Sequence, residues 1–275
     1  YIVDFKNQPN TTLEIGRLRE LSFRKAGGGT GNSYDLDEYD QRDEAYYKQL
    51  IVWDPDEKQI IGGYRFLIGS DLILSKKYHH TATNHLFNFS PLFLDTIFPF
   101  TIELGRSFVQ PAYQPASGNR KSIFSLDNLW DGLGALVVDY PKIKFFFGKV
   151  TMYSNYNKMG RDIILGFLGY FFPNKENWVL PKQPLKSHHD ISSFMKKIEN
   201  LEYKLAYKEL IKNLRDLECS LPPLIAAYMN LSRTMKSFGT ALNNKFGDVE
   251  ETGILISIED IYSEKKDRHI NTYIK

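Results

Sequence analysis

The stretch Thr101-Ile-Glu-Leu-Gly-Arg-Ser-Phe-Val-Gln-Pro-Ala-Tyr113 decides the fold expected for this chain. Its apolar residues predict a buried strand, which must end near Pro111 because proline cannot donate to a β-ladder. Glu103 and Arg106 stand inside this strand, and a charge in a core strand is costly unless it is paired or used. Gly105 lies between them and leaves room for another chain or a ligand to approach the backbone.

Two interpretations of this strand stay open. It is either an edge strand with a solvated glutamate and arginine, or a central strand that carries catalytic groups. Residues three apart fall on opposite faces of a regular strand, so the two charges share a face only if a bulge turns one of them. The rest of the chain must decide between the two interpretations.

Length and composition describe an ordinary globular protein. The chain has 275 residues, of which 42% are hydrophobic and 25% charged, as in one large domain or a domain with an appendage. A net charge of +2 gives no field that would favour nucleic acid as a partner. The single cysteine, Cys219, excludes an internal disulfide and predicts a reducing, cytoplasmic location. No apolar run is long enough to span a bilayer.

In the N-terminal third, a segment rich in arginine is followed by a segment rich in aspartate. Thr11-Thr-Leu-Glu14 has the form of a capping box and predicts the start of a helix that carries several arginines. Gly27-Gly-Gly-Thr-Gly31 must be a loop, but it lacks the Lys-Ser/Thr ending of a P-loop. The acidic residues at 35–40 lack the spaced glycine and final glutamate of a calcium loop. They form either a solvated loop or the partners of the arginines.

Apolar periodicity places the remaining elements and predicts a mixed α/β domain of single-core type. Besides the strand that opens at Thr101, strands are expected at 49–53, 60–68, 144–153 and 253–258. The segment 87–98 is expected to be a short helix or a loop. Helices are expected at 123–140, 161–172, 190–217 and 221–235. The face of the 190–217 helix that carries Lys196, Lys197, Lys204, Lys208 and Lys212 is either simply solvated or attracted to an anionic membrane or an acidic carrier protein.

Several charged motifs resemble one family of acyltransferases. Acyl-homoserine-lactone synthases share the spacings Arg19-x-x-x-Phe23, Asp37-x-x-Asp40, Gly-x-x-Arg65 and Glu103-x-x-Arg106. The ornithine-lipid and glycine-lipid N-acyltransferases, often called hemolysin-like, resemble the chain from about residue 11 to 268. Their matching stretches are Arg17-Leu-Arg19, Gly63-Tyr-Arg65, Glu103-Leu-Gly-Arg-Ser107, Pro111-x-Tyr113, Leu129-Trp130-x-Gly132, Leu221-Pro-Pro-Leu224 and Phe246-Gly-Asp248. The lactone synthases carry a tryptophan where this chain has its glycine cluster, which argues against lactone synthesis.

The resemblance implies the GNAT (acyl-CoA N-acyltransferase) fold, a mixed central sheet flanked by helices. Residues 1–180 would form this core, and residues 181–275 a C-terminal extension with a long basic helix, followed by a helix and a strand that complete the domain. The implied reaction moves a (3-hydroxy)fatty acyl group from a phosphopantetheine thioester to the amine of an amino acid, ornithine or glycine, in aminolipid synthesis. Acyl carrier protein, or else coenzyme A, would supply the thioester, and no cofactor would be bound permanently.

The resemblance also implies roles for single residues. Glu103 would be the general base, with Arg106 beside it, because a protonated amine must lose a proton before it can attack. Arg19, Asp37, Asp40, Arg65 and Arg106 would form one buried ionic network, with Phe23 beside the acceptor. Backbone N–H groups would stabilise the oxyanion near Ser107, Phe108 and Val109. The phosphate of the donor would rest on Ser117, Gly118, Asn119, Arg120 and Lys121.

Two alternative functions remain beside this interpretation. The chain could be a coenzyme A-dependent acetyltransferase, or a hemolysin-like protein that binds lipid or carrier protein without turnover. Tyr153 and Tyr156 are either general acids for the leaving thiolate or core residues. The pairs His79-His80 and His188-His189 lack partners at metal-ligand spacing, so no metal site is expected.

Overall fold

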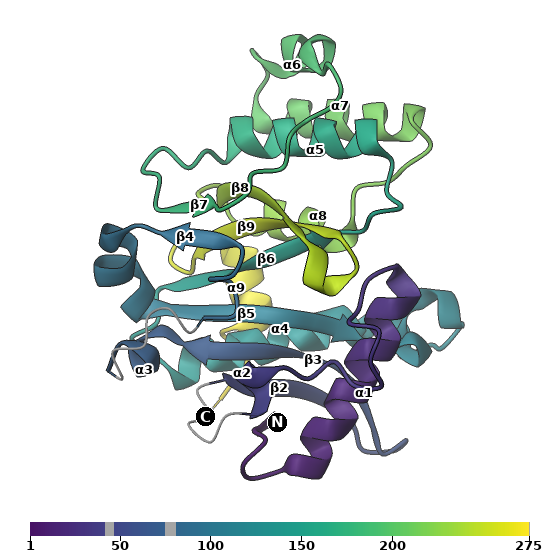
Figure 1. Cartoon of the computed structure of the whole chain (residues 1–275), viewed down its shortest axis with the longest axis vertical. Helices are drawn as coiled ribbons and strands as arrows, with labels where there is room; N and C mark the ends of the chain where they lie inside the picture. Colours follow the sequence, from purple (N-terminus) through teal and green to yellow (C-terminus); the bar gives the residue numbers. More distant parts are fainter. Residues whose placement is uncertain (42–46, 75–80, 275) are drawn as a thin grey trace.

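A mixed seven-stranded sheet forms the middle layer of the protein. The computed structural model describes residues 1–41, 47–74 and 81–274. Within these residues the strand order is β1-β2-β3-β5-β6-β9-β8 (Figure 1). The pair β5–β6 is parallel and its neighbours are antiparallel. The predicted mixed α/β fold is therefore confirmed, and β5, the strand that opens at Thr101, is a central strand rather than an edge strand.

Most strands coincide with the apolar runs of the sequence. The large sheet contains Ile2–Val3 (β1), Tyr47–Asp54 (β2), Gln59–Ile68 (β3), Thr101–Val109 (β5), Phe145–Met152 (β6), Lys236–Asn243 (β8) and Val249–Ser257 (β9). The expectation of a helix or loop at 87–98 was partly wrong, because Phe87–Phe89 (β4) pairs with Val179–Pro181 (β7) in a small second sheet. β8 was missed, since its residues form no apolar run.

Helices cover both faces of the large sheet. Ser122–Asp139 (α4), Lys158–Phe171 (α5) and Pro223–Met229 (α8) pack on one face, and Ser263–His269 (α9) packs on α4. The other face carries Pro9–Ala26 (α1), Glu38–Gln41 (α2), Gly69–Leu74 (α3) and the small sheet. Short 3₁₀ or π turns occupy Phe93–Ile97, Phe98–Phe100, Pro111–Tyr113, Pro115–Ser117 and Asn244–Phe246.

The first helix begins earlier than its capping box predicted. α1 starts at Pro9, and Gln8 precedes it without a side-chain cap. Proline suits this first position because its missing N–H would have had no partner there. Thr12 lies inside the helix and its hydroxyl donates to the carbonyl of Gln8. The expected capping box was therefore wrong.

The long basic helix expected at 190–217 was also wrong, because it consists of two helices. Ser192–Ile198 (α6) and Tyr203–Asp216 (α7) pack against each other and against α5 (Figure 1). The apolar stripe changes phase at the break, since Leu205 is 50% exposed whereas Ala206 and Leu210 are buried. A single straight helix could not bury both stripes. All five lysines of this segment are exposed.

The large sheet joins the two parts of the chain that the sequence separated at residue 180. β9 pairs with β6 along its whole length, and β8 pairs with β9. Strands from before and after residue 180 therefore share one sheet. The division into a core and an extension stays a prediction, but it does not correspond to a break in this sheet.

Candidate active site

A bulge in β5 brings Arg106 to the face of the sheet that carries Arg65. Gly63 pairs with Phe108 and Arg65 pairs with Gly105, so that Arg106 and Ser107 both stand opposite one residue of β3. Arg106 has a φ of 50°, a left-handed conformation that is uncommon for a residue with a side chain. This is the bulge that the spacing of Glu103 and Arg106 required if they share a face.

A cavity opens where β5 and β6 separate. Their parallel pairing runs from Thr101 and Phe145 to Leu104 and Gly148 and ends there, although both strands continue. A cavity of about 200 Å³ lies at this point and is lined from both faces of the sheet. A Cβ atom added at Gly105 would meet no described atom within 4 Å, so the room that this glycine implied exists.

Three arginines and three aspartates form a closed ring of ion pairs beside this cavity. Arg19, Arg65 and Arg106 come from α1, β3 and β5, and the aspartates come from the segment between α1 and β2. Around the ring the N–O distances are 2.9 Å (Arg19–Asp35), 2.8 Å (Asp35–Arg106), 3.7 Å (Arg106–Asp37), 2.7 Å (Asp37–Arg65), 2.9 Å (Arg65–Asp40) and 3.0 Å (Asp40–Arg19). We call these six residues the ionic ring. Its formal charges cancel.

The ring keeps the carboxylates of Asp35 and Asp40 ionised although both are buried. Burial alone would raise the pKa of Asp40, but Arg19 and Arg65 hold it well below the usual range. Burial would likewise raise the pKa of Asp35, and Arg19 with Arg106 lowers it. Burial would lower the pKa of Arg65, but Asp40 and Asp37 raise it above its ordinary value. Asp35, Asp40 and Arg65 are therefore charged around neutral pH.

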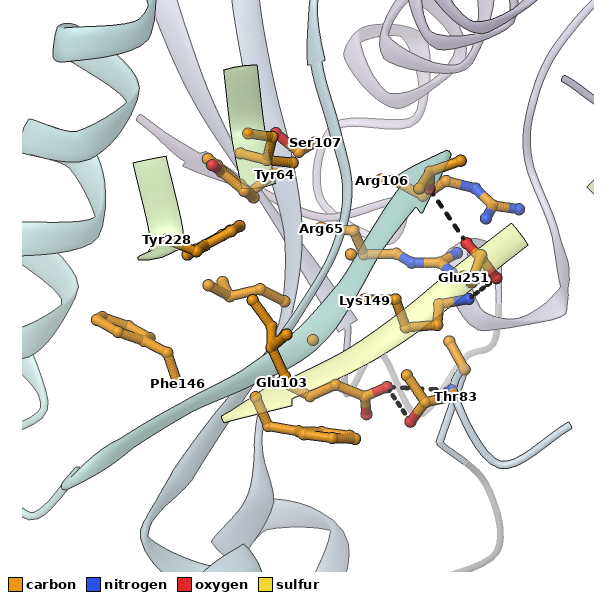
Figure 2. A pocket seen from close by; sticks show the side chains of 18 of the residues that line it. Tyr64, Arg65, Thr83, Glu103, Arg106, Ser107, Phe146, Lys149, Tyr228 and Glu251 are labelled. Atoms are coloured by element: carbon orange, nitrogen blue, oxygen red, sulfur yellow. Dashed lines mark hydrogen bonds and ion pairs between the residues drawn. The ribbon is translucent and has the colours of Figure 1, made fainter. Parts of the chain in front are cut away.

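Glu103 stands next to the ring, but its hydrogen-bond partners among the described residues include no cation. One carboxylate oxygen accepts from the hydroxyl of Tyr47 at 2.8 Å, and the other accepts from the hydroxyl and the backbone N–H of Thr83 at 2.7 and 3.1 Å. Glu103 is buried and lines the cavity (Figure 2). Burial raises the pKa of its carboxyl, and the bonds from Thr83 and Tyr47 offset this only in part. The result is a fixed carboxylate with raised basicity.

A second ion pair lies on the same side of the cavity. Lys149, on β6, places its Nζ 2.7 Å from Oε2 of Glu251, on β9 (Figure 2). Burial alone would raise the pKa of Glu251, but Lys149 lowers it below its ordinary value. The opposite side is apolar with hydroxyl groups, and Figure 2 shows Tyr64, Ser107, Phe146 and Tyr228 there.

Comparison with known proteins shows the family of the chain. Residues 18–121 match the acetyltransferase (GNAT) domain. The chain is 49% identical over 280 residues to a glycine N(alpha)-acyltransferase of Phocaeicola vulgatus, covering 100% of this chain and 84% of the relative. It is 50% identical over 276 residues to a glycine N(alpha)-acyltransferase of Bacteroides thetaiotaomicron, covering 100% and 82%. The chain belongs to this acyltransferase family. No solved structure matches it.

The acyltransferase brings most of the predicted residues together. Glu103, Arg106, Arg65, Ser107 and Phe23 line the cavity. Arg19, Asp37 and Asp40 belong to the ionic ring but do not line the cavity. Phe108 packs on α1 in the core, and Val109 ends β5. The roles given to these residues remain predictions.

The loop expected to hold phosphate lies outside the cavity. Ser117, Gly118, Asn119, Arg120 and Lys121 precede α4 and do not line it. Lys121 is engaged by Asp54, with 2.7 Å between Nζ and Oδ2, and Arg120 is exposed. A role in donor binding therefore stays a prediction, with Arg120 as the more accessible cation.

The other predicted candidates are spread over the molecule. Tyr153 lines the cavity, whereas the hydroxyl of Tyr156 donates to the carbonyl of Ser220. His189 pairs with Asp162 at 2.8 Å. His79 and His80 lie outside the described residues. Among those that are described, no helix is both long and apolar enough to cross a membrane.

Sequence reasoning offered residues 35–40 as partners of the arginines but left Asp35 out of the ionic network, and it gave no role to Lys149 or to two tyrosines of the acyltransferase. Asp35 closes the ionic ring, and three buried arginines could have signalled the need for a third aspartate. A lysine inside the strand Phe-Phe-Phe-Gly-Lys is the same signal as Glu103 in β5, and it was overlooked. Tyr64 lies in the stretch Gly63-Tyr-Arg65 that resembles the family, but neither Tyr64 nor Tyr228 received a role, because a core tyrosine and a cavity tyrosine look alike in sequence.

Proposed function

We propose that this acyltransferase moves a fatty acyl group from a thioester to the amine of glycine, with Glu103 as the general base. The observation that carries the proposal is the buried Glu103 carboxylate in the cavity between β5 and β6. The names of the two relatives support glycine as the acceptor. The raised pKa of Glu103 supports its role, because a general base works best when its pKa approaches the working pH.

The reaction follows from what each group can accept or donate. The ammonium group of glycine gives a proton to Glu103, and the freed lone pair attacks the thioester carbonyl carbon. A C–N bond forms, the carbonyl electrons move to oxygen, and their return breaks the C–S bond. The nitrogen, which is still positively charged after the attack, loses its second proton to the departing thiolate, and Glu103 releases the first proton to solvent, so that an amide and a thiol result. Tyr47 and Thr83 hold Glu103 in place throughout.

The developing oxyanion needs hydrogen-bond donors at the boundary between the two strands. We place the backbone N–H groups of the bulge region, Ser107 to Val109, in this role, because a bulge leaves its extra residue without a ladder partner. The Tyr64 hydroxyl is a further donor. Its Oη is buried and has no hydrogen-bond partner among the described residues, although Ser107 and Tyr228 lie beside it.

We propose acyl carrier protein, carrying a 3-hydroxyacyl group, as the donor, and an aminolipid pathway as the context. Carrier proteins are acidic, and the exposed lysines of α6 and α7 together with Arg120 offer positive charge to such a surface. The same lysines would support peripheral contact with an anionic membrane. Coenzyme A remains the alternative donor, and ornithine the alternative acceptor.

The test is thiol release from 3-hydroxyacyl carrier protein with glycine, ornithine, or no acceptor. The parent is expected to turn over glycine, and Glu103→Gln is expected to lose about 10²- to 10⁴-fold in kcat while it remains folded. Glu14→Gln is the matched control, because Glu14 pairs with Arg17 on the exposed side of α1. Release with acetyl-coenzyme A alone would favour the alternative donor. No release with either donor, in a folded protein that still binds carrier protein, would contradict the proposal.

A further inference from the structure

The cation best placed to meet an acceptor in the cavity is Lys149. Phe147 pairs with Glu103 across the parallel strands, and Lys149 follows two residues later on β6. Residues two apart in a strand share a face, so Lys149 and Glu103 face the same side of the sheet. Both line the cavity, and Figure 2 shows their charged ends on the same side of it.

The ammonium group of Lys149 still has N–H donors to offer, whereas the carboxylate of its partner Glu251 already accepts hydrogen bonds from other groups. Oε2 of Glu251 accepts from Lys149 at 2.7 Å and from Nδ2 of Asn243 at 2.8 Å, while Thr151 approaches Oε1 at 3.5 Å. An ammonium group has three N–H donors. Within the described part of the chain, Glu251 is the hydrogen-bond partner found for Lys149. The Lys149 side chain is 9% exposed, so its remaining donors depend on what occupies the cavity.

The other cations at the site are more fully neutralised. Arg65 contacts Asp37 and Asp40, and Arg106 contacts Asp35 and Asp37. Among the described residues, Lys149 contacts one carboxylate, that of Glu251. An anionic ligand group would therefore compete with two aspartates at either arginine, but with one glutamate at Lys149. Opposite it, Glu103 is a carboxylate held by hydroxyl and amide donors, and it suits an ammonium group.

We propose that Lys149 binds the α-carboxylate of the acceptor, while Glu103 receives its ammonium group. The inference rests on the proposed function, and it deepens that function by assigning the acceptor subsite. The ligand class is a zwitterionic α-amino acid, bound between opposite charges on β5 and β6. The site therefore selects amino acids over amines that lack a carboxylate, and the selection resides in Lys149.

The experiment compares glycine with glycinamide, which keeps the amine and the size but lacks the carboxylate. For Lys149→Met we expect kcat/KM with glycine to fall about 10- to 100-fold, mainly through KM, as for the loss of a hydrogen bond between charged groups. With glycinamide, the same variant should change less than about 3-fold. Lys158→Met is the matched control, because Lys158 pairs with Glu250 at 3.0 Å and does not line the cavity, while Arg161 still holds Glu250.

Two further measurements keep the outcome decisive. If Lys149→Met does not fold, Lys149→Met combined with Glu251→Gln removes both charges and should show the same preference. Equilibrium binding of radiolabelled glycine, without any acyl donor, should be weakened in the variants that carry Lys149→Met but not in Lys158→Met. If the parent protein binds glycine but does not acylate it, the proposed function is contradicted, whereas the acceptor subsite is supported. Equal losses with glycine and glycinamide, or unchanged glycine binding, would overturn the subsite.

Discussion

The two sides of the cavity are built on opposite principles. The side that carries Glu103, Lys149 and the ionic ring is charged, and almost every charge there is paired before any ligand binds. The side that carries Tyr64, Phe146 and Tyr228 is uncharged, and the Tyr64 hydroxyl there has no hydrogen-bond partner among the residues that the structure describes. A zwitterionic acceptor suits the first side and an acyl thioester suits the second. The sheet opens between them, where β5 and β6 separate.

The largest effect is expected when the charged side is broken at Asp40. Asp40→Ala removes a partner of both Arg19 and Arg65, which are fully buried or nearly so. The ring is left with one uncompensated positive charge, which should lower the free energy of unfolding by about 3–5 kcal/mol, as measured by denaturant titration at pH 7. The exposed pair provides the control, because Glu14→Ala should cost at most about 1 kcal/mol. Equal costs would mean that the ring does not stabilise the fold.

The stability difference between the parent and Asp40→Ala should also depend on pH, in a direction that the pKa shifts determine. Arginines lower the pKa values of Asp35 and Asp40 in the folded state, so their contribution to stability is present above the unfolded pKa of about 3.9. It is lost as the pH falls through the folded pKa values. The stability difference between the parent and Asp40→Ala should therefore shrink below about pH 4. A difference that grows in acid would contradict the assignment.

Filling the boundary between the two sides should affect activity more than stability. Gly105 pairs with Arg65 and so faces the charged side, and a Cβ there would meet no described atom within 4 Å. Gly105→Leu should lower kcat/KM for glycine about 10²-fold, because its side chain would occupy space beside Glu103. Gly105→Ala should have a smaller effect. Unfolding measurements should show a change of no more than about 1 kcal/mol.

The chain offers a matched glycine as control. Gly169, in α5, also has no described atom within 4 Å of an added Cβ, but it lies away from the cavity. Gly169→Leu should therefore leave the kinetics unchanged. If Gly105→Leu is equally silent, the acceptor does not bind where β5 and β6 separate.

The sequence predicted the sheet centre and the charged side better than the uncharged side. Strands β2, β3, β5 and β6 follow apolar runs, and a charge inside such a run is conspicuous because it must be paired. Glu103, Arg65 and Arg106 were found in this way, and Lys149 could have been. The break between α6 and α7 was not predictable from periodicity alone, because each half is regular. The change of phase at Leu205 depends on what the helices pack against.

The smallest effects on stability should come from substitution of two tyrosines, Tyr47 on the charged side of the cavity and Tyr64 on the uncharged side. The Tyr47 hydroxyl is fully used, because it donates to Glu103 and accepts from the backbone N–H of Ala82. Tyr47→Phe should therefore lower the free energy of unfolding by about 1–2 kcal/mol. The Tyr64 hydroxyl has no partner among the described residues, so Tyr64→Phe should leave stability unchanged or raise it by up to about 1 kcal/mol.

For Tyr64→Phe, activity should fall although stability does not. If the Tyr64 hydroxyl donates to the oxyanion as proposed, Tyr64→Phe should lower kcat about tenfold, with the KM for glycine unchanged. A loss of stability in Tyr64→Phe without a loss of kcat would show that this hydroxyl belongs to the core. The uncharged side would then serve only to hold the acyl chain, and the oxyanion would depend on backbone N–H groups alone.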